Sequence, residues 1–358
     1  MVLPEPVVVG AGGDFSALPQ SPAVYLIWPR QGRPYLGRTS VLRRRMTRLW
    51  EKWRLGETTE RIEYWPAASR LELWLVSYEL GRRHFPEDYA RLLRLPKPAY
   101  VRLVLSNRFP RTMITTRVGG GRSIYFGPFA SRANADQFES RFLDLFQIRR
   151  CQEDLIPAPD HPGCIYGEMN MCLRPCQQAV TDEEYASETT RVDEFLRGRG
   201  AALIETTKAA RDRFSEELSF EEAARQHARL EKIQEIVKLP GELAREARAL
   251  HGVAVTPSAE PESVRLWFLR EGCWLNPRTL PLSLDQTISL DGRLREITST
   301  LEDPDPKLRP DHLALLAKWF YSSWRDGEWL SFDDPPALSY RKLVNAIHRV
   351  AKSSSDVR

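Results

Sequence analysis

Short apolar runs along the chain predict β-strands. Runs of strand length occupy residues 23–28, 101–105 and 113–118, and a second short strand is expected to begin at 34–37 after a Gln-Gly-Arg turn. Residues 264–274 alternate between apolar and polar, as two paired strands do. These segments predict sheets near both ends of the sequence.

Apolar residues at helical spacing predict helices between and after these strands. One helix is expected to begin after Ser40, and another is expected over 71–84, where Pro86 ends it. A highly charged helical stretch is expected over 183–238, and an apolar helix over 313–324. The chain is therefore predicted to be a multi-domain protein of the α/β (α+β) class, which its 358 residues also favour.

Four segments have the composition of irregular structure. Residues 1–19 are interpreted as a loose leader, 125–129 as a compact aromatic turn, 253–262 as a linker and 353–358 as a frayed tail. They are expected to separate the regular elements rather than to take part in them.

Composition excludes several classes of protein. Hydrophobic residues make up 42% of the chain and charged residues 28%, which is ordinary for a folded soluble protein. The sequence has no run of about 18 apolar residues, so no membrane span is predicted. Residues 1–19 lack the basic start and apolar stretch of a secretory signal. The cytoplasm is therefore the expected compartment, and no membrane partner is expected.

Basic residues concentrate between Arg30 and Arg54, although the net charge is only +4. This stretch has a single acid, Glu51, and its inner basic residues are Arg33, Arg38, Arg43, Arg44, Arg45, Arg48 and Lys52. An arginine-rich run of one sign favours contact with phosphate groups. A solvated helix face is the alternative.

Most of the cysteines lie in one segment, at Cys151, Cys164, Cys172 and Cys176. In a reducing compartment this clustering favours metal ligands over disulfides. The thiols can close a zinc site or hold an iron–sulfur cluster, and the presence of only one close pair suits a cubane better. Four unconnected buried thiols are the remaining alternative. Cys273 stands alone and is expected to be a small buried strand residue.

Several short motifs occur in the order in which one protein family has them. They are Pro22–Tyr25, Pro34–Arg38, Leu42–Arg45, Tyr125–Phe129, Arg149–Cys151, Cys172–Cys176, Phe195–Gly198 and Phe220–Arg225. From about residue 20 to about residue 330 the chain resembles the N-terminal half of UvrC, the bacterial nucleotide-excision-repair nuclease, and its shorter Cho-type relatives. The RNase H-like domain and the helix-hairpin-helix repeat of a full UvrC are expected to be absent.

The resemblance implies an organisation into domains. A GIY-YIG nuclease-like domain is expected at 20–98, a linking module with a four-cysteine iron–sulfur site at 99–182, and a helical region with a UVR-type hairpin at 183–240. A C-terminal α+β region of unassigned function is expected at 262–350.

The resemblance also implies a catalytic group in the first domain. Tyr25 and Tyr35 occupy the two tyrosine positions of the GIY-YIG family, and Arg45 occupies the position of the arginine that stabilises the phosphate. Arg38 stands where the family usually has a lysine, so the charge is kept while the compact ammonium is lost. Hydrolysis would use Mg²⁺ or Mn²⁺.

The family's metal-binding glutamate is the main departure from this pattern. If Glu72 and Pro86 are aligned with the family's helix, the metal position falls on Ser77. A serine hydroxyl is a poor lone ligand for Mg²⁺, and Glu72 and Glu79 share a helix face that points away from Ser77. Three hypotheses therefore stay open: an endonuclease that incises DNA beside a lesion, a non-catalytic DNA- and partner-binding paralogue, and a metal-cluster protein acting on RNA or on mobile-element DNA.

The remaining implications concern the cofactor and the partners. The four clustered cysteines would ligate a [4Fe–4S] cluster, with zinc as the alternative that the residues alone leave open. The expected partners are double-stranded DNA, expected to carry damage, and a UvrB-type helicase. DNA would contact Arg43, Arg44 and Arg48 of the basic helix. The helicase would dock on a helical hairpin at 202–237 through Phe220, Glu221, Ala224 and Arg225.

Overall fold

The computed structural model divides the chain into two compact units, one of residues 1–96 with 251–358 and one of residues 97–250. The residues that the structure describes are 1–10, 15–53, 55–282, 289–332 and 339–355. The end of the expected tail, 356–358, lies outside the described residues.

The first unit begins with a four-stranded antiparallel sheet in the order β1-β4-β2-β3. Its strands are β1 (Val7–Gly10), β2 (Ala23–Pro29), β3 (Tyr35–Thr39) and β4 (Thr59–Pro66). The strands predicted at 23–28 and 34–37 are therefore confirmed to within two residues at each end.

The expected loose leader is wrong, because part of it is an edge strand. Val7 to Gly10 pair with β4, and Phe15 and Leu18 are buried in the core beneath the sheet. The glycines and prolines of this segment hid a short valine run that can add to a sheet edge.

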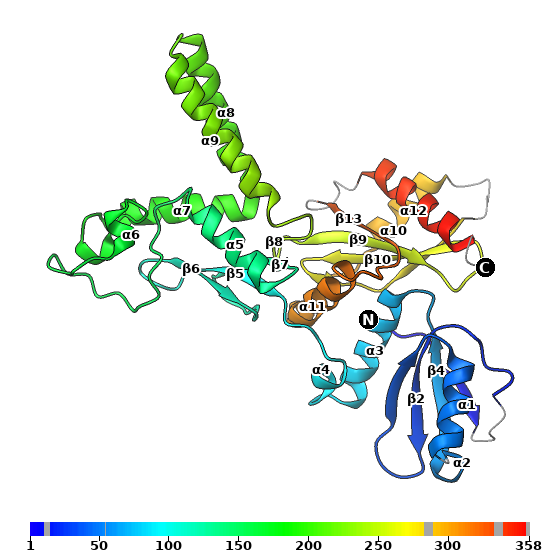
Figure 1. Ribbon diagram of the computed structural model, residues 1–358. Coiled ribbons are helices and arrows are strands. Elements are labelled where there is room, and N and C mark those ends of the chain that lie inside the picture. The colour runs from blue at the N-terminus through cyan, green and yellow to red at the C-terminus, as the bar shows by residue number, and fades with distance from the viewer. Residues whose placement is uncertain (11–14, 54, 283–288, 333–338, 356–358) are drawn as a thin grey trace. The chain divides into compact units, whose positions relative to one another are not determined.

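Helices cover both faces of this sheet. The helix α1 (Leu42–Trp53) packs Leu42, Met46 and Leu49 against the face that carries Tyr25. The helix α3 (Arg70–His84) packs Val76 and Leu80 against the opposite face, and the side chain of Ser69 caps its first turn. Two short helices, α2 (Leu55–Thr58) and α4 (Tyr89–Leu92), follow α1 and α3. Figure 1 shows α1 lying along the sheet.

A second antiparallel sheet lies in the C-terminal part of the first unit, where β9 and β10 are central. Its strands are β9 (His251–Pro257), β10 (Ser263–Arg270), β11 (Cys273–Trp274), β12 (Arg278–Pro281) and β13 (Glu328–Phe332). The strand pair predicted at 264–274 is confirmed, with Cys273 buried in it. The linker prediction is wrong for 253–257, because these residues form most of β9; the apolar run is short and ends in prolines, which made it look irregular.

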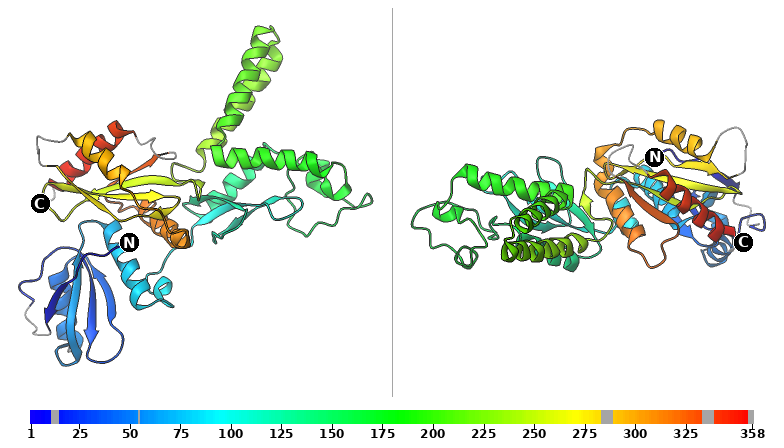
Figure 2. Two further views of the ribbon diagram at one scale, coloured as in Figure 1. Left: turned by 180° about the vertical axis from the view of Figure 1, so that it is seen from behind. Right: turned by 90° about the horizontal axis from the view of Figure 1, so that it is seen from above.

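Three helices and a short 3₁₀ turn complete this part, and they are α10 (Leu290–Ser299), η2 (Pro306–Leu308), α11 (Arg309–Phe320) and α12 (Tyr340–Ser355). The helices α10 and α12 bury Leu294, Leu343 and Ile347 on one face of the C-terminal sheet, and Figure 2 shows both helices beside that sheet. The helix α11 contacts β11 and also α3. The C-terminal residues therefore share one compact unit with the N-terminal sheet.

The second unit contains a sheet in the order β6-β5-β7-β8 and the helix α5 (Arg132–Leu143). The strands are β5 (Ala99–Val104), β6 (Arg111–Thr115), β7 (Ile124–Phe129) and β8 (Arg245–Glu246). The aromatic turn expected at 125–129 is wrong, because these residues are the fully buried strand β7. The Gly-Pro pair in its middle had indicated a turn, whereas a strand can hold both residues where the ladder is irregular.

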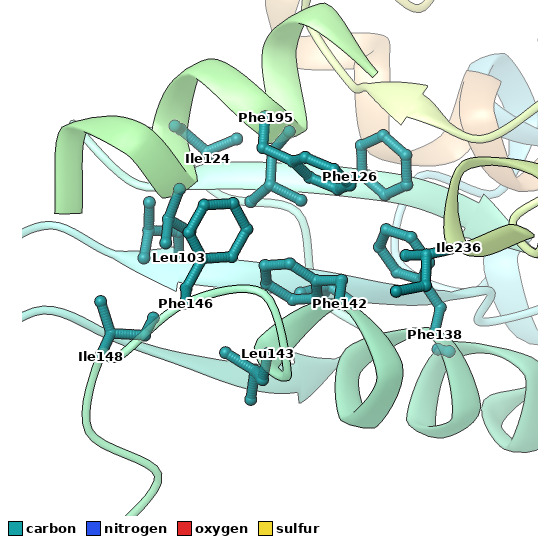
Figure 3. Packing of buried hydrophobic residues seen from close by; sticks show 14 of the residues in the cluster. Leu103, Ile124, Phe126, Phe138, Phe142, Leu143, Phe146, Ile148, Phe195 and Ile236 are labelled. Carbon is teal, nitrogen blue, oxygen red and sulfur yellow. The ribbon is translucent and has the colours of Figure 1, made fainter. Parts of the chain in front are cut away.

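Aromatic rings form the core of the second unit. Phe138 stacks on Phe126 at 5.1 Å and on Phe142 at 5.3 Å between ring centroids, and Phe142 stacks on Phe195 at 5.8 Å. Figure 3 shows these rings together with the aliphatic side chains around them. This core fixes α5 on the sheet and joins both to the helices that follow.

Those helices are α6 (Ile165–Glu168), η1 (Pro175–Gln177), α7 (Asp182–Gly198), α8 (Ala201–Glu216) and α9 (Phe220–Lys238). The helices α8 and α9 lie side by side as a hairpin (Figures 1 and 2). The hairpin predicted at 202–237 is therefore confirmed. Among the described residues, no helix has both the length and the apolar character needed to cross a membrane.

Candidate DNA-binding and cofactor sites

Tyr25, Tyr35 and Arg45 lie together on the α1 face of the N-terminal sheet. The Nε of Arg45 donates a hydrogen bond of 3.0 Å to the phenolic oxygen of Tyr25. The ring centroids of Tyr25 and Tyr35 are 6.2 Å apart. Tyr25 is buried, whereas Tyr35 is 42% exposed, so the group opens to solvent on the side of Tyr35.

A glycine on the neighbouring strand makes this arrangement possible. Gly37 lies opposite Tyr25 in the β2–β3 ladder. A Cβ on Gly37 would come within 2.3 Å of the Tyr25 ring, so the ring lies directly over the glycine backbone. Any side chain at this position would push the phenol away from Arg45.

The electrostatics of the group keep Tyr25 protonated. Burial raises the pKa of Tyr25, and the hydrogen bond from Arg45 only partly offsets this rise. The same hydrogen bond raises the pKa of Arg45, with a smaller contribution from Tyr35. The site therefore presents a fixed positive charge and a neutral phenol, which can bind and orient a phosphate or a water molecule but cannot supply a phenolate base at neutral pH.

The basic helix α1 also lines a cavity of about 560 Å³, to which Tyr25, Tyr35 and Arg45 do not contribute. The predicted DNA-contacting residues Arg43, Arg44 and Arg48 all line it, together with the acid Glu51. Arg44 and Arg48 are exposed. Arg43 instead uses its Nε to hold the carbonyl oxygen of Leu18 at 2.7 Å. The structure thus leaves Arg44 and Arg48 open to a ligand and gives Arg43 a structural contact.

Arg38 lies on the other face of the sheet, away from Tyr25 and Arg45. It is opposite Val24 in the β2–β3 ladder, and Val24 packs in the core beneath α3. Its guanidinium carbon is 3.5 Å from the centroid of the Trp74 ring. The predicted catalytic set is therefore divided, with three members on the α1 face and Arg38 on the α3 face.

The α3 residues considered as metal ligands are engaged elsewhere. Ser77 is 2% exposed, and its hydroxyl donates a hydrogen bond of 2.6 Å to the Leu73 carbonyl one turn earlier. Glu72 accepts a hydrogen bond from the Ala68 backbone and forms an ion pair with Arg265.

Glu79 lies 3.3 Å from the amino group of Met1. Burial, rather than its charged neighbours, dominates the pKa of Glu72 and raises it. None of Ser77, Glu72 and Glu79 offers a free carboxylate, so α3 does not fit a Mg²⁺ site.

The four clustered cysteines lie close enough to affect one another. Cys172 and Cys176 are buried, and Cys151 and Cys164 are half-buried. Burial raises the pKa of the Cys172 thiol to about 11, and each of the other three thiols adds to this rise. Among the described residues, no three His, Cys, Asp or Glu side chains are arranged to hold a single metal ion.

Polar hydrogens point at the sulfur atoms of this group. The backbone N–H of Arg174 donates to Cys172 Sγ at 3.4 Å, and the Arg149 guanidinium donates to Cys151 Sγ at 3.7 Å. Such donors stabilise thiolates and sulfur-bound clusters. These two donors would stabilise the thiolate forms of Cys172 and Cys151, which a sulfur-bound cofactor would require.

The predicted docking residues lie at one end of the α8–α9 hairpin. Phe220 is 65% exposed and Leu218 is 71% exposed. Glu221, Ala224 and Arg225 are all exposed. Leu230, in the middle of α9, is buried. The most exposed large apolar side chains of the hairpin are therefore Leu218 and Phe220 at its tip.

The sequence did not indicate a role for three residues of the first unit that line the cavity or form a cation–π contact. Glu51 was noted only as the one acid of a basic run, yet it lines the arginine cavity. Trp74 and Lys318 were not singled out, although Lys318 Nζ lies 3.4 Å from the Trp74 ring centroid. The helical spacing that puts Glu51 three residues from Arg48 is visible in the sequence, whereas the meeting of Trp74 with Lys318 has no sequence signal.

The fold and its sites define a mixed α/β protein in which one unit carries a tyrosine–arginine group and the other a four-thiol group. Residues 100–196, which include all four clustered cysteines, match the middle domain of the UvrC/Cho excinucleases. The resemblance to the UvrC/Cho-type excinuclease family is thereby confirmed, and it extends over most of the chain.

The chain is 25% identical over 351 residues to UvrABC system protein C of Moorella thermoacetica, covering 94% of this chain and 57% of that protein. It is 27% identical over 275 residues to the protein of that name from Oleidesulfovibrio alaskensis, covering 74% of this chain and 39% of that protein.

A third relative is UvrABC system protein C of Lawsonia intracellularis, which is 25% identical over 339 residues, covering 91% of this chain and 53% of that protein. The chain thus spans between 39% and 57% of the length of these relatives. No solved structure matches the chain.

Proposed function

We propose that this chain is a UvrC-type nucleotide-excision-repair protein that incises double-stranded DNA beside a lesion, together with a UvrB-type helicase. The observation that carries the proposal is the meeting of Tyr25, Tyr35 and Arg45 on one face of the N-terminal sheet. The similarity to UvrABC system protein C over most of the chain supports it. The open arginines of α1, the helix that also carries Arg45, supply the charge that DNA binding requires.

Each side chain of the group has a task in phosphodiester hydrolysis. Arg45 stabilises the charge that develops on the phosphate. Tyr25, held neutral by burial, orients the attacking water or a phosphate oxygen through its O–H. Tyr35 lies at the open side, where the DNA strand enters. Because α3 does not fit a metal site, no step is assigned to a metal ion, and Glu51 is the carboxylate to test as a ligand.

The test is incision of a lesion-bearing plasmid by the full chain with a UvrB-type helicase and Mg²⁺ or Mn²⁺. The wild type should nick the plasmid, and Arg45→Gln should lower the rate by about 100-fold or more, the usual loss when a charge-stabilising donor is removed. Arg341→Gln, an exposed arginine of α12, is the matched control and should leave the rate unchanged. Nicking that survives Arg45→Gln would contradict the assignment.

The similarity to UvrABC system protein C does not favour the alternative, a DNA- and helicase-binding paralogue without incision activity, but the contacts of α3 make it worth testing. The acids of α3 are held by Arg265 and by the amino group of Met1, and Ser77 is buried. The same plasmid assay separates the two functions. Wild-type protein that binds DNA and helicase but gives no nick with either metal would establish the second function.

We also propose that Cys151, Cys164, Cys172 and Cys176 ligate a [4Fe–4S] cluster. The closeness of Cys151, Cys164 and Cys176 to Cys172 and the N–H donors to Cys172 and Cys151 support a shared thiolate-held group. Protein purified without oxygen should contain iron and sulfide, and Cys172→Ser should lose both. Cys273→Ser is the control, since this thiol is a buried residue of β11. Stoichiometric zinc without sulfide would contradict the cluster.

The helicase is proposed to dock on the tip of the α8–α9 hairpin. Phe220 is the anchor because it is a large apolar side chain left 65% exposed, and Glu221 and Arg225 lie beside it at the rim. Phe220→Ala should weaken helicase binding by about 2 kcal/mol or more while the iron content stays unchanged. Leu239→Ala, which changes a 37% exposed side chain at the base of the hairpin, is the matched control. Equal loss of affinity in both variants would contradict docking at the tip.

A further inference from the structure

Two cationic side chains from distant parts of the sequence meet on Trp74, and one of them, Lys318, also bonds the backbone of a third cationic residue, Arg94. Arg38 comes from β3, Arg94 follows α4, and Lys318 comes from α11. The Arg38 guanidinium lies 3.5 Å and the Lys318 ammonium 3.4 Å from the centroid of the Trp74 ring. The group is therefore assembled only when the C-terminal region packs on α3.

The indole stabilises these charges but does not neutralise them. Each cation–π contact contributes about 0.5–2 kcal/mol. Other arginines of this unit have acids, as Arg61 has Glu63 and Arg265 has Glu72. Within the described residues, by contrast, no ion pair is recorded for Arg38, Arg94 or Lys318. Three unneutralised cations held together generate a local positive potential.

The charges also repel one another, which lowers their pKa values. Burial lowers the pKa of Lys318 to about 8, and Arg38 and Arg94 contribute to that shift. Burial likewise lowers the pKa of Arg38, with a second contribution from Arg94. An anion placed among them would relieve this repulsion and return both pKa values toward their ordinary range.

The donors of the group have different tasks. Lys318 Nζ donates to the backbone carbonyls of Leu93 at 3.4 Å and Arg94 at 3.1 Å, so it is held in place and contributes mainly its charge. No side-chain hydrogen bond from Arg38 or Arg94 is recorded in the described parts of the chain. Their guanidinium groups therefore keep N–H donors for a ligand, and a guanidinium fork fits the oxygens of phosphate.

We propose that Arg38, Arg94 and Lys318 form a second phosphate-binding site, built jointly by the N-terminal sheet and the C-terminal region, that takes a backbone phosphate of DNA. The site lies on the α3 face of the sheet, whereas the tyrosine–arginine group lies on the α1 face. It thus gives the C-terminal region a part in holding DNA. The inference rests on the proposed DNA-binding function, and its failure can be told apart from the failure of that function.

The experiment measures binding of a lesion-bearing duplex by the full chain as a function of salt. Lys318→Gln removes the charge and keeps an N–H donor for the two carbonyls, and Lys318→Arg keeps the charge. Lys318→Gln should weaken binding and lower the salt slope by about one unit, and Arg38→Gln should do the same, while Lys318→Arg should restore the wild-type slope. Lys307→Gln, an exposed lysine of η2, is the matched control.

Two further comparisons show whether the second site or the proposed DNA binding is wrong, and whether the bound phosphate belongs to DNA. If Arg44→Gln weakens binding but Lys318→Gln and Arg38→Gln leave affinity and slope unchanged, the second site is wrong and DNA binding stands. If none of these variants changes binding, the proposed function fails with it. Inorganic phosphate should compete with the duplex for the wild type at low salt. Phosphate that raises the melting temperature of the wild type but not of Lys318→Gln, with DNA affinity equal in both, would show that the site takes free phosphate and would overturn the DNA assignment.

Discussion

The two faces of the N-terminal sheet are built from the same strands but differ in what covers them. Tyr25 and Gly37 face α1, while their neighbours Val24 and Arg38 face α3. The α1 face is flanked by exposed arginines and a cavity. The α3 face is covered by a helix that the C-terminal region holds at several points.

One of those points of attachment involves Glu72, an acid that a metal site on α3 would need. Arg265 pairs with Glu72, Asp311 accepts hydrogen bonds from Tyr78 at 3.0 Å and from Tyr89 at 2.6 Å, and Asp326 accepts one from the Arg70 backbone at 2.6 Å. Acids on a helix can thus form structural contacts even where a family pattern predicts that they bind a metal ion. Substitutions that affect one face at a time test this division of tasks.

The largest effect is expected from the ion pair that anchors α3. Arg265→Ala leaves the carboxylate of Glu72, which is 4% exposed, without its partner. Removal of one member of a buried pair costs about 3–5 kcal/mol of unfolding free energy. Urea unfolding of the full chain measures it, and Glu72→Gln combined with Arg265→Met should recover most of the loss. A loss below about 1 kcal/mol would show that the pair does not hold α3.

An intermediate effect is expected from the buried histidine of α11. His312 Nδ1 accepts a hydrogen bond of 2.9 Å from the Trp274 backbone, and its ring contacts Tyr78 edge-on at 5.4 Å. Burial lowers the pKa of His312 to about 3, helped by the charges of the Met1 amino group and Arg82.

Because this folded pKa lies below the ordinary value of 6.5, the neutral ring stabilises the fold fully above pH 6.5 and loses its contribution as the pH falls toward 3. At pH 5 the loss should be about 2 kcal/mol. Unfolding measured from pH 7 to pH 5 should show this slope in the wild type and not in His312→Gln. The control His227→Gln, on the hairpin helix α9, should keep the wild-type slope.

The smallest effect is expected on the open face. Arg44→Gln and Arg48→Gln should each lower the salt slope of DNA binding by about one unit, since each side chain is exposed at the cavity. Neither should change the free energy of unfolding by more than about 0.5 kcal/mol. Arg43→Gln should instead lower stability more than the salt slope, because its bond to Leu18 holds the segment before β2. Equal salt slopes for all three variants would show that Arg43 does not differ from Arg44 and Arg48 in its contact with DNA.

Local signals allow much of this fold to be predicted. The strands around Tyr25, the helix ended by Pro86 and the hairpin tip at Phe220 follow from patterns of a few residues. The strands β7 and β9 were missed for a local reason, because Gly127-Pro128 and Pro257 have the composition of turns. The spacing of the cysteines by itself indicates a shared site.

Tertiary contacts account for what the sequence could not predict. The side chain of Ser77 is turned inward to Leu73, and Lys318 reaches Trp74 from the far end of the chain. The division of Arg38 from Tyr25 depends on the alternation of side chains across β3, which the pairing register establishes. Such contacts link residues that are far apart in the sequence, so no local sequence pattern predicts them.

The most direct test of the account is to map which face of the sheet meets DNA. A photoreactive amino acid at Tyr35, which is 42% exposed beside Tyr25 and Arg45, should crosslink to a lesion-bearing duplex on irradiation. The same amino acid at Val8, which is 57% exposed on the edge strand β1, should crosslink far less. Strong crosslinking at Tyr35 that is lost in the Arg44→Gln, Arg48→Gln double variant is the predicted result. Equal crosslinking at the two positions, or none at Tyr35 while the protein still binds the duplex, would contradict the assignment of this face to DNA.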